Sequence, residues 1–75
     1  MAGNPPIVVH RISASGGRRV TVSGRILGLA HSDDATLELL HGAGITGTAD
    51  LLADPTMVDW VGGRPHQYQL LELMP

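Results

Sequence analysis

The 75-residue sequence has no cysteine, no phenylalanine and no lysine. Without cysteine the chain can form neither a disulfide nor a thiolate metal site, which is typical of proteins in a reducing compartment. One tryptophan and one tyrosine are its only large aromatic residues, so the core has to be built from aliphatic side chains. Because a domain of this size buries only about 60% of the surface of its unfolded chain, we expect marginal stability, which self-association would increase.

Long apolar runs are also missing. None approaches the ~18 residues that a membrane-spanning helix needs, and residues 1–6 lack the basic stretch and apolar segment of a secretory signal. We therefore expect a cytoplasmic protein with no membrane partner. The chain contains no internal repeat and no linker, which predicts a flexible leader over residues 1–6 and a single domain over residues 7–75.

The charges are divided unevenly along the chain. Residues 1–31 carry four arginines and no acid, a charge of +4, whereas residues 32–75 carry seven acids and one arginine, a charge of −6. Such asymmetry is typical of a basic surface that meets an anionic partner, or of opposite faces that associate. It is equally explained by two halves that neutralise each other within one fold.

The amino-terminal half is typical of antiparallel strands. β-branched residues fill positions 7–12, and residues 18–22 alternate apolar and polar side chains. Ser23 and Gly24 form a two-residue break of the kind that joins hairpin strands, and Ile26 and Leu27 resume the apolar run. With the turn at residues 13–17, this pattern predicts a three-stranded antiparallel meander and an α+β fold.

A helix is predicted to begin at Ser32. Serine is a good N-cap residue, and Asp33 and Asp34 place negative charge in the first turn, where the helix dipole favours it. Gly44 can adopt the left-handed conformation that ends a helix and lets Ile45 contact the last turn. A second helical segment over residues 49–52 has to stop before Pro55.

The carboxyl-terminal third is open to two interpretations. Residues 56–62 form either a short helix or a strand, and the preferences of Val58, Trp60 and Val61 favour the strand. Residues 67–73 then return as a last strand, which gives a C-terminal β-hairpin or a helix followed by a strand. On the strand interpretation Trp60 and Tyr68 lie close together across the hairpin.

Motifs that carry chemistry are weak in this chain. Residues 42–47 spell G-x-G-x-x-G, but these glycines follow a predicted helix instead of a strand, so a helix cap explains them better than a nucleotide site. The spacing of the four histidines fits no closed metal site, and no nucleophile elbow or other catalytic signature is present. The sequence therefore predicts no enzyme, no cofactor, no metal and no small-molecule substrate.

Two candidate binding surfaces remain. A loop of aromatic and basic residues could act as a protein interface, because these residue types anchor many such contacts. The basic meander could instead contact nucleic acid as a β-ribbon. We expect a non-enzymatic interaction module that acts by protein contact or self-association, with a nucleic-acid-binding regulator as the alternative. The candidate residues are Trp60, Arg64 and Tyr68 for the first surface and Arg11, Arg18, Arg19 and Arg25 for the second.

One short stretch has a likeness among known families. Residues 18–22, RRVTV, beside a basic turn resemble a strand of the swapped-hairpin DNA-binding domains of bacterial transition-state regulators and antitoxins. That resemblance implies DNA contact through the hairpin. Ser23 and Gly24 stand where those domains usually carry a Pro-Lys element.

Overall fold

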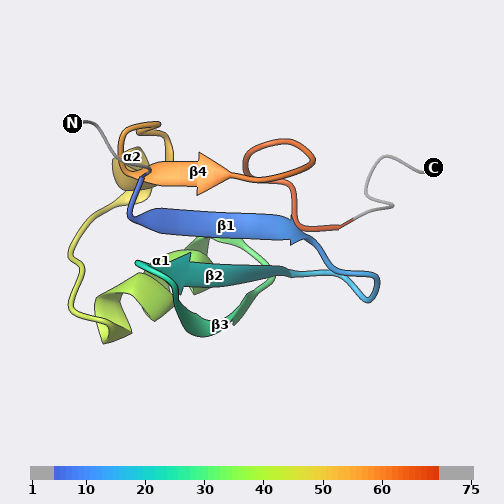
Figure 1. Ribbon diagram of the computed structural model, residues 1–75, viewed down its shortest axis with the longest axis horizontal. Helices are drawn as coiled ribbons and strands as arrows, with labels where there is room; N and C mark the ends of the chain where they lie inside the picture. Colours follow the sequence, from blue (N-terminus) through green and yellow to red (C-terminus); the bar gives the residue numbers. More distant parts are fainter. Residues whose placement is uncertain (1–4, 70–75) are drawn as a thin grey trace.

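The chain forms one four-stranded sheet with two helices. The computed structural model describes residues 5–69. Strands 1 to 3 are antiparallel neighbours, and the short fourth strand lies parallel to the first, so the strand order is β3-β2-β1-β4 (Figure 1). The predicted α+β class and the three-stranded meander are confirmed. The elements are β1 (Ile7–Ile12), β2 (Arg18–Val22), β3 (Arg25–Ala30), α1 (Asp33–Gly42), α2 (Ala49–Leu52) and β4 (Val58–Trp60).

The turn between β2 and β3 is the two-residue hairpin that the sequence predicts. Val22 and Arg25 are partners on either side of Ser23 and Gly24, whose φ angles are 50° and 85°. Two consecutive positive φ angles define a type I′ turn, whose twist matches that of the flanking strands. The carbonyl of Pro6 accepts a hydrogen bond of 2.8 Å from the Ser23 N–H, so this end of the predicted leader is attached to the hairpin.

Both antiparallel pairings contain a bulge. The register between β1 and β2 shifts between Val9 and Ile12, and that between β2 and β3 shifts between Val20 and Thr21. Gly28 lies at the second bulge with a φ of 154°, and a Cβ there would lie 3.1 Å from Leu39 of α1. Glycine therefore lets α1 approach the sheet closely at this point.

Helix α1 has the predicted caps. The Ser32 Oγ accepts a hydrogen bond of 3.1 Å from the Ala35 N–H. At the other end Gly44 has a φ of 89°, and the Ile45 N–H donates to the Leu40 carbonyl over 2.9 Å. The Gly44 N–H also donates to the His41 carbonyl over 3.0 Å. These two carboxyl-terminal bonds form the Schellman motif, which satisfies carbonyls that the helix leaves unpaired.

The strand interpretation of residues 56–62 is confirmed by β4, but its pairing differs from the expected hairpin. β4 pairs parallel with β1, with Val8 opposite Asp59. A parallel connection needs a long crossover, and here α1 and α2 lie within it. Residues 61–69 then form an irregular loop, and residues 70–73 of the predicted last strand lie outside the described residues.

The helices cover one face of the sheet. In Figure 1, α1 lies behind β2 and β3, and the near face of the sheet has no helix over it. Within the described residues no helix is long and apolar enough to cross a membrane. The core fills the space between the helices and the sheet with aliphatic side chains and one tyrosine, as the composition predicts. Its buried members are Ile7, Val9, Val20, Ala30, Leu40, Leu52, Val58 and Tyr68.

Candidate interaction surface

The strand register decides which side of the sheet each basic residue occupies. Residues that pair directly across antiparallel strands point to the same side of the sheet. The side that faces the helices is marked by the pairs of Val9 with Val20 and of Ile7 with Val22, because Val9, Val20 and Ile7 are all buried. We call this the helix side and the opposite one the open face.

Arg18 lies on the helix side and is fully buried. The residue paired with it on β3 is Ala30, which is also fully buried. The prediction that Arg18 contacts a partner from the surface is therefore corrected, because its guanidinium is not accessible. Since β2 alternates, Arg19 points the other way and is exposed.

The guanidinium of Arg18 instead organises the loop that follows β4. It donates to the carbonyls of Gln67 over 2.7 Å, Gly62 over 2.8 Å and Arg64 over 2.9 Å. Its Cζ also lies 5.3 Å from the centroid of the Trp60 ring, in the geometry of a cation–π contact. The five N–H donors of a planar guanidinium suit this task, which a lysine could not perform. Residues 61–67 are thereby wrapped around one side chain.

Glycine is required where the loop passes closest to Arg18. Gly63 has a φ of 69°, and a Cβ at this position would lie 2.7 Å from the Arg18 Nη2. The pair of glycines at positions 62 and 63 is therefore part of the arginine site.

Tyr68 is buried and holds the end of this loop against α1. Its hydroxyl donates to the Asp33 carboxylate over 2.7 Å and lies 2.9 Å from the Thr36 hydroxyl. Burial raises the pKa of Tyr68 well above its ordinary value, and the adjacent Asp33 carboxylate adds to the shift. The phenol therefore stays protonated throughout the physiological range.

The predicted aromatic patch is buried at Tyr68 and only partly accessible at Trp60. Trp60 and Tyr68 do lie close together, with ring centroids 6.0 Å apart in an edge-to-face arrangement. Tyr68 is only 5% exposed, however, and Trp60 is half-buried. Arg64 is exposed on the loop, while its carbonyl is engaged by Arg18. Trp60 and Tyr68 therefore belong mainly to the packing of the loop, whereas the Arg64 side chain stays accessible.

A shallow hollow of about 370 Å³ lies where this loop meets the start of α1. Within it the His66 Nδ1 lies 2.7 Å from the Asp33 carboxylate, and the His66 ring also contacts Trp60 at 5.0 Å. The Ser32 hydroxyl in the same hollow serves as the N-cap of α1. Within residues 5–69 no group of histidine and acidic side chains is arranged to hold a metal ion.

Arg25 lies at a third location. It pairs with Val22, which pairs in turn with the buried Ile7, so it points to the helix side. There it lines a hollow with Gly42 and Ala43 at the carboxyl end of α1, where the helix dipole favours a cation. The four arginines of the meander are thus divided between the core, one end of α1 and the open face.

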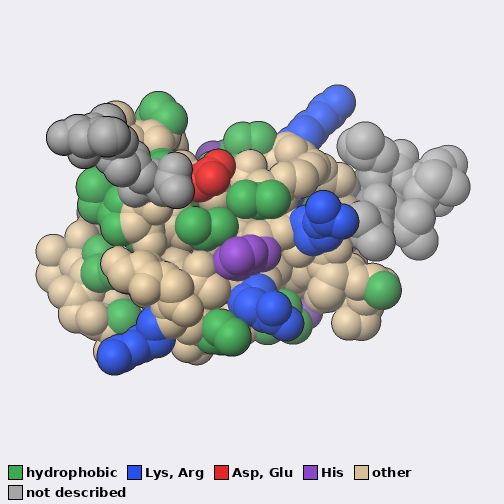
Figure 2. All heavy atoms as spheres, in the orientation of Figure 1, with side chains coloured by type: hydrophobic (Ala, Val, Ile, Leu, Met, Phe, Trp, Pro, Cys, Tyr) green, Lys and Arg blue, Asp and Glu red, His purple; other side chains and the backbone are tan. Residues whose placement is uncertain are grey.

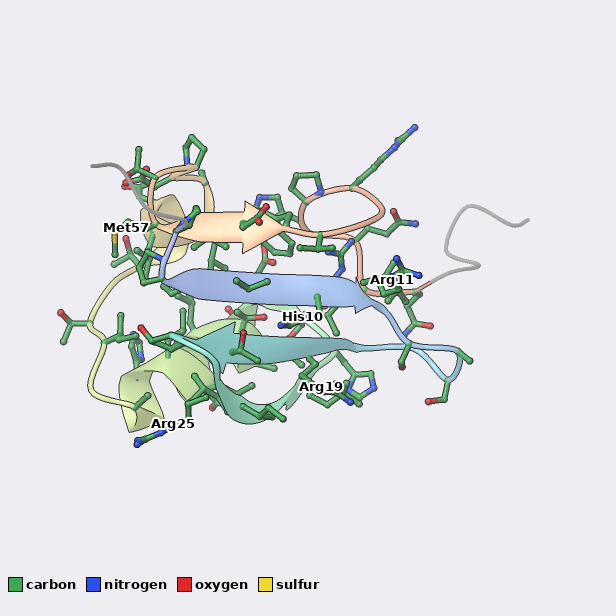
Figure 3. All side chains as sticks on the ribbon, in the orientation of Figure 1. His10, Arg11, Arg19, Arg25 and Met57 are labelled. Atoms are coloured by element: carbon green, nitrogen blue, oxygen red, sulfur yellow. The ribbon has the colours of Figure 1, made fainter. Side chains whose placement is uncertain are left out.

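The open face carries both basic and apolar side chains. Arg11 and Arg19 are exposed beside His10, whose Nε2 lies 3.0 Å from the Thr21 hydroxyl (Figure 3). In Figure 2 this face shows basic side chains, the purple of histidine near its centre and a single acidic patch. The apolar side chains are the ones that sequence analysis missed. Among residues 5–69 the large hydrophobic side chains that stay exposed are Ile26, at 62%, and Leu29, at 49%.

Ile26 and Leu29 could not be found from spacing alone. Ile26 pairs with Thr21 and Leu29 pairs with Arg19, which places both on the open face. Positions three residues apart on a regular strand point to opposite sides, and only the bulge at Gly28 brings them to the same side. The glycine inside an otherwise apolar strand was the available signal.

No family model matches the chain, and no curated protein or solved structure matches it either.

Proposed function

We propose that this protein is a non-enzymatic interaction module that binds a partner protein through the open face of its sheet. The observation that carries the proposal is the position of the exposed apolar side chains. Leu29 lies opposite Arg19 and Ile26 opposite Thr21, on the face that the helices leave uncovered. Contiguous apolar side chains rimmed by polar ones are typical of surfaces that bind proteins, and arginine is enriched in such interfaces.

A protein partner fits this face better than a nucleic acid does. Arg18 is withdrawn into the core and Arg25 points to the helix side, which leaves Arg11 and Arg19 for phosphate contacts. Both aromatic side chains, Trp60 and Tyr68, belong to the helix side, so this face has no ring on which a base could stack. Few cations and no stacking platform argue for apolar contact as the source of affinity.

The polar groups in the hollow at the start of α1 are engaged within the fold. The Ser32 oxygen there accepts from the backbone of the helix, and the Asp33 carboxylate is shared by His66 and Tyr68. Each of these polar groups has a structural task in holding the loop to α1. Such bonds stabilise the fold, which supports assigning the function to the opposite face.

The test is site-specific photo-crosslinking in extracts of the cells that make the protein. A photoreactive residue replaces Leu29 on the open face, and the matched control replaces Ala53, which is exposed at the end of α2. We expect one protein other than this chain to be crosslinked from position 29 and not from position 53, and this product to be lost when Arg19→Ala is added. Equal labelling from both positions would contradict the proposal.

A parallel titration with random duplex DNA examines the alternative. Binding to phosphates weakens steeply with salt, because it depends on the release of counterions. We expect no binding at moderate salt. The proposal would be overturned by a DNA complex that forms at low salt and is abolished by the double variant Arg11→Ala, Arg19→Ala. That result would show that the open face binds nucleic acid.

A further inference from the structure

The free edge of β3 has features of its own. In the described sheet β3 is the outermost strand on one side, so its outer backbone groups have no neighbouring strand. Both large hydrophobic side chains that are exposed among the described residues, Ile26 and Leu29, lie on this strand. An edge strand with exposed apolar side chains is a template for pairing with a further strand.

Because of the bulge, successive residues of β3 point to the two sides of the sheet in a symmetric order. Arg25 points to the helix side, Ile26 to the open face, Leu27 and Gly28 to the helix side, and Leu29 to the open face. The buried Ala30 ends the strand on the helix side. This order is the same when it is followed from either end. When a second copy pairs antiparallel with β3, each residue can therefore lie opposite one that points to the same side of the sheet. In a regular strand of six residues, paired end to end in this way, opposite residues would point to different sides.

We propose that a second copy of this chain pairs antiparallel with β3 about a two-fold axis between Leu27 and Gly28. Ile26 then lies opposite Leu29 of the partner subunit, and two four-stranded sheets become one sheet of eight strands. This inference rests on the proposed function, because both take the partner to be a protein. The pairing uses the edge of the sheet, whereas the proposed partner binds the open face. The pairing extends that face across both subunits.

The charges around the edge are complementary in this arrangement. Arg25 lies opposite Ala30 of the partner subunit, just before the acidic first turn of the partner's α1, where Asp34 is exposed. Within one chain Arg25 and Asp34 are at opposite ends of α1, whose ten residues span about 15 Å. The two side chains can therefore meet between subunits and not within one.

Because the natural chain has no cysteine, the register can be tested by disulfide trapping. Ile26→Cys and Leu29→Cys variants are mixed and oxidised, with Ala53→Cys as the exposed control. Residues directly opposite each other on antiparallel strands have Cβ atoms close enough for a disulfide. We expect the mixed 26–29 disulfide to form several-fold faster than either homodimer or the control. Preferential 26–26 or 29–29 disulfides, or no excess over the control, would overturn the proposal.

A charge exchange examines the same arrangement without cysteine. By sedimentation over a wide concentration range, Arg25→Glu is expected to raise the dimer Kd by about tenfold, and Asp34→Arg in the same chain to restore it. A monomer at every concentration of the natural protein would mean that the bulge protects the edge from pairing, and would refute the inference. Arg19→Ala separates the two proposals, because it removes partner crosslinking and leaves the dimer unchanged.

Discussion

Arg18 and Arg19 are adjacent in the sequence and identical in chemistry, yet they belong to different parts of the molecule. Arg18 is fully buried, and its guanidinium donates to the backbone of the loop after β4. Arg19 is exposed on the open face, beside Leu29. The difference comes from the alternation of a strand, since one residue of displacement moves a side chain from one face to the other. A basic stretch in a strand therefore does not define a basic surface.

The two faces also differ in how they are stabilised. On the helix side Arg18 and Tyr68 are both hydrogen-bonded, and residues 5–69 contain no buried side-chain nitrogen or oxygen without a partner. On the open face apolar side chains meet solvent. Removing a polar group from the helix side leaves its buried hydrogen-bond partners unsatisfied. Removing a side chain from the open face leaves its neighbours in contact with water. This contrast can be tested by mutation.

The largest difference in the free energy of unfolding is expected between Arg18→Ala and Arg19→Ala. Arg18→Ala should lower the free energy of unfolding by about 3 kcal/mol or more, because the hydrogen bonds to a charged donor are lost and several carbonyls are left without it. Arg19→Ala should change it by less than about 0.5 kcal/mol, as for other exposed positions. Urea denaturation of both variants measures the difference.

Arg18→Lys sharpens this comparison. Lysine keeps the charge but cannot reach several divergent carbonyls from one planar group, so most of the loss should remain. Full stability in Arg18→Lys would show that charge alone, and not the guanidinium geometry, holds the loop.

A smaller effect is expected from the Tyr68 hydroxyl. Tyr68→Phe should lower stability by about 1 to 2 kcal/mol at neutral pH, through the loss of its bond to Asp33. It should also change the response to alkali. The folded-state pKa is raised, so the natural protein loses stability above about pH 10, as the unfolded chain loses the phenolic proton and the folded one retains it.

The chain is well suited to this measurement because it has no lysine, no cysteine and no second tyrosine. The alkaline decrease therefore reports Tyr68, and Tyr68→Phe should remove it. Denaturation at a series of pH values from 8 to 11 gives the slope, which is at most about 1.4 kcal/mol per pH unit. An equal decrease in both proteins would contradict the assignment.

The smallest effect is expected from the pair of His66 and Asp33. Both side chains are substantially exposed, at 45% and 37%, so the pair should contribute less than about 1 kcal/mol and weaken with salt. His66→Asn is the suitable change, because asparagine tolerates the positive φ of 69° at this position. A double-mutant cycle with Asp33→Asn isolates the pairwise contribution. A coupling as large as the effect of Arg18→Ala would contradict the proposed difference between buried and exposed contacts.

Much of the fold was predictable from short patterns. Ser32 capped α1, Gly44 ended it, and Ser23 with Gly24 formed the hairpin, each because local backbone geometry favours these residues. The binding residues were less predictable. The apolar side chains of Ile26 and Leu29 become exposed through a bulge, and Arg18 becomes buried because a loop more than forty residues away closes over it.

The sequence by itself determined the strands of the meander, the helix ends and the lack of disulfides, because these depend on neighbouring residues and on composition. Only the tertiary structure decided that β4 lies parallel to β1 and that the loop after it reaches Arg18. It also decided which arginine faces solvent. Register and layer packing depend on contacts between distant segments, and no local preference specifies them.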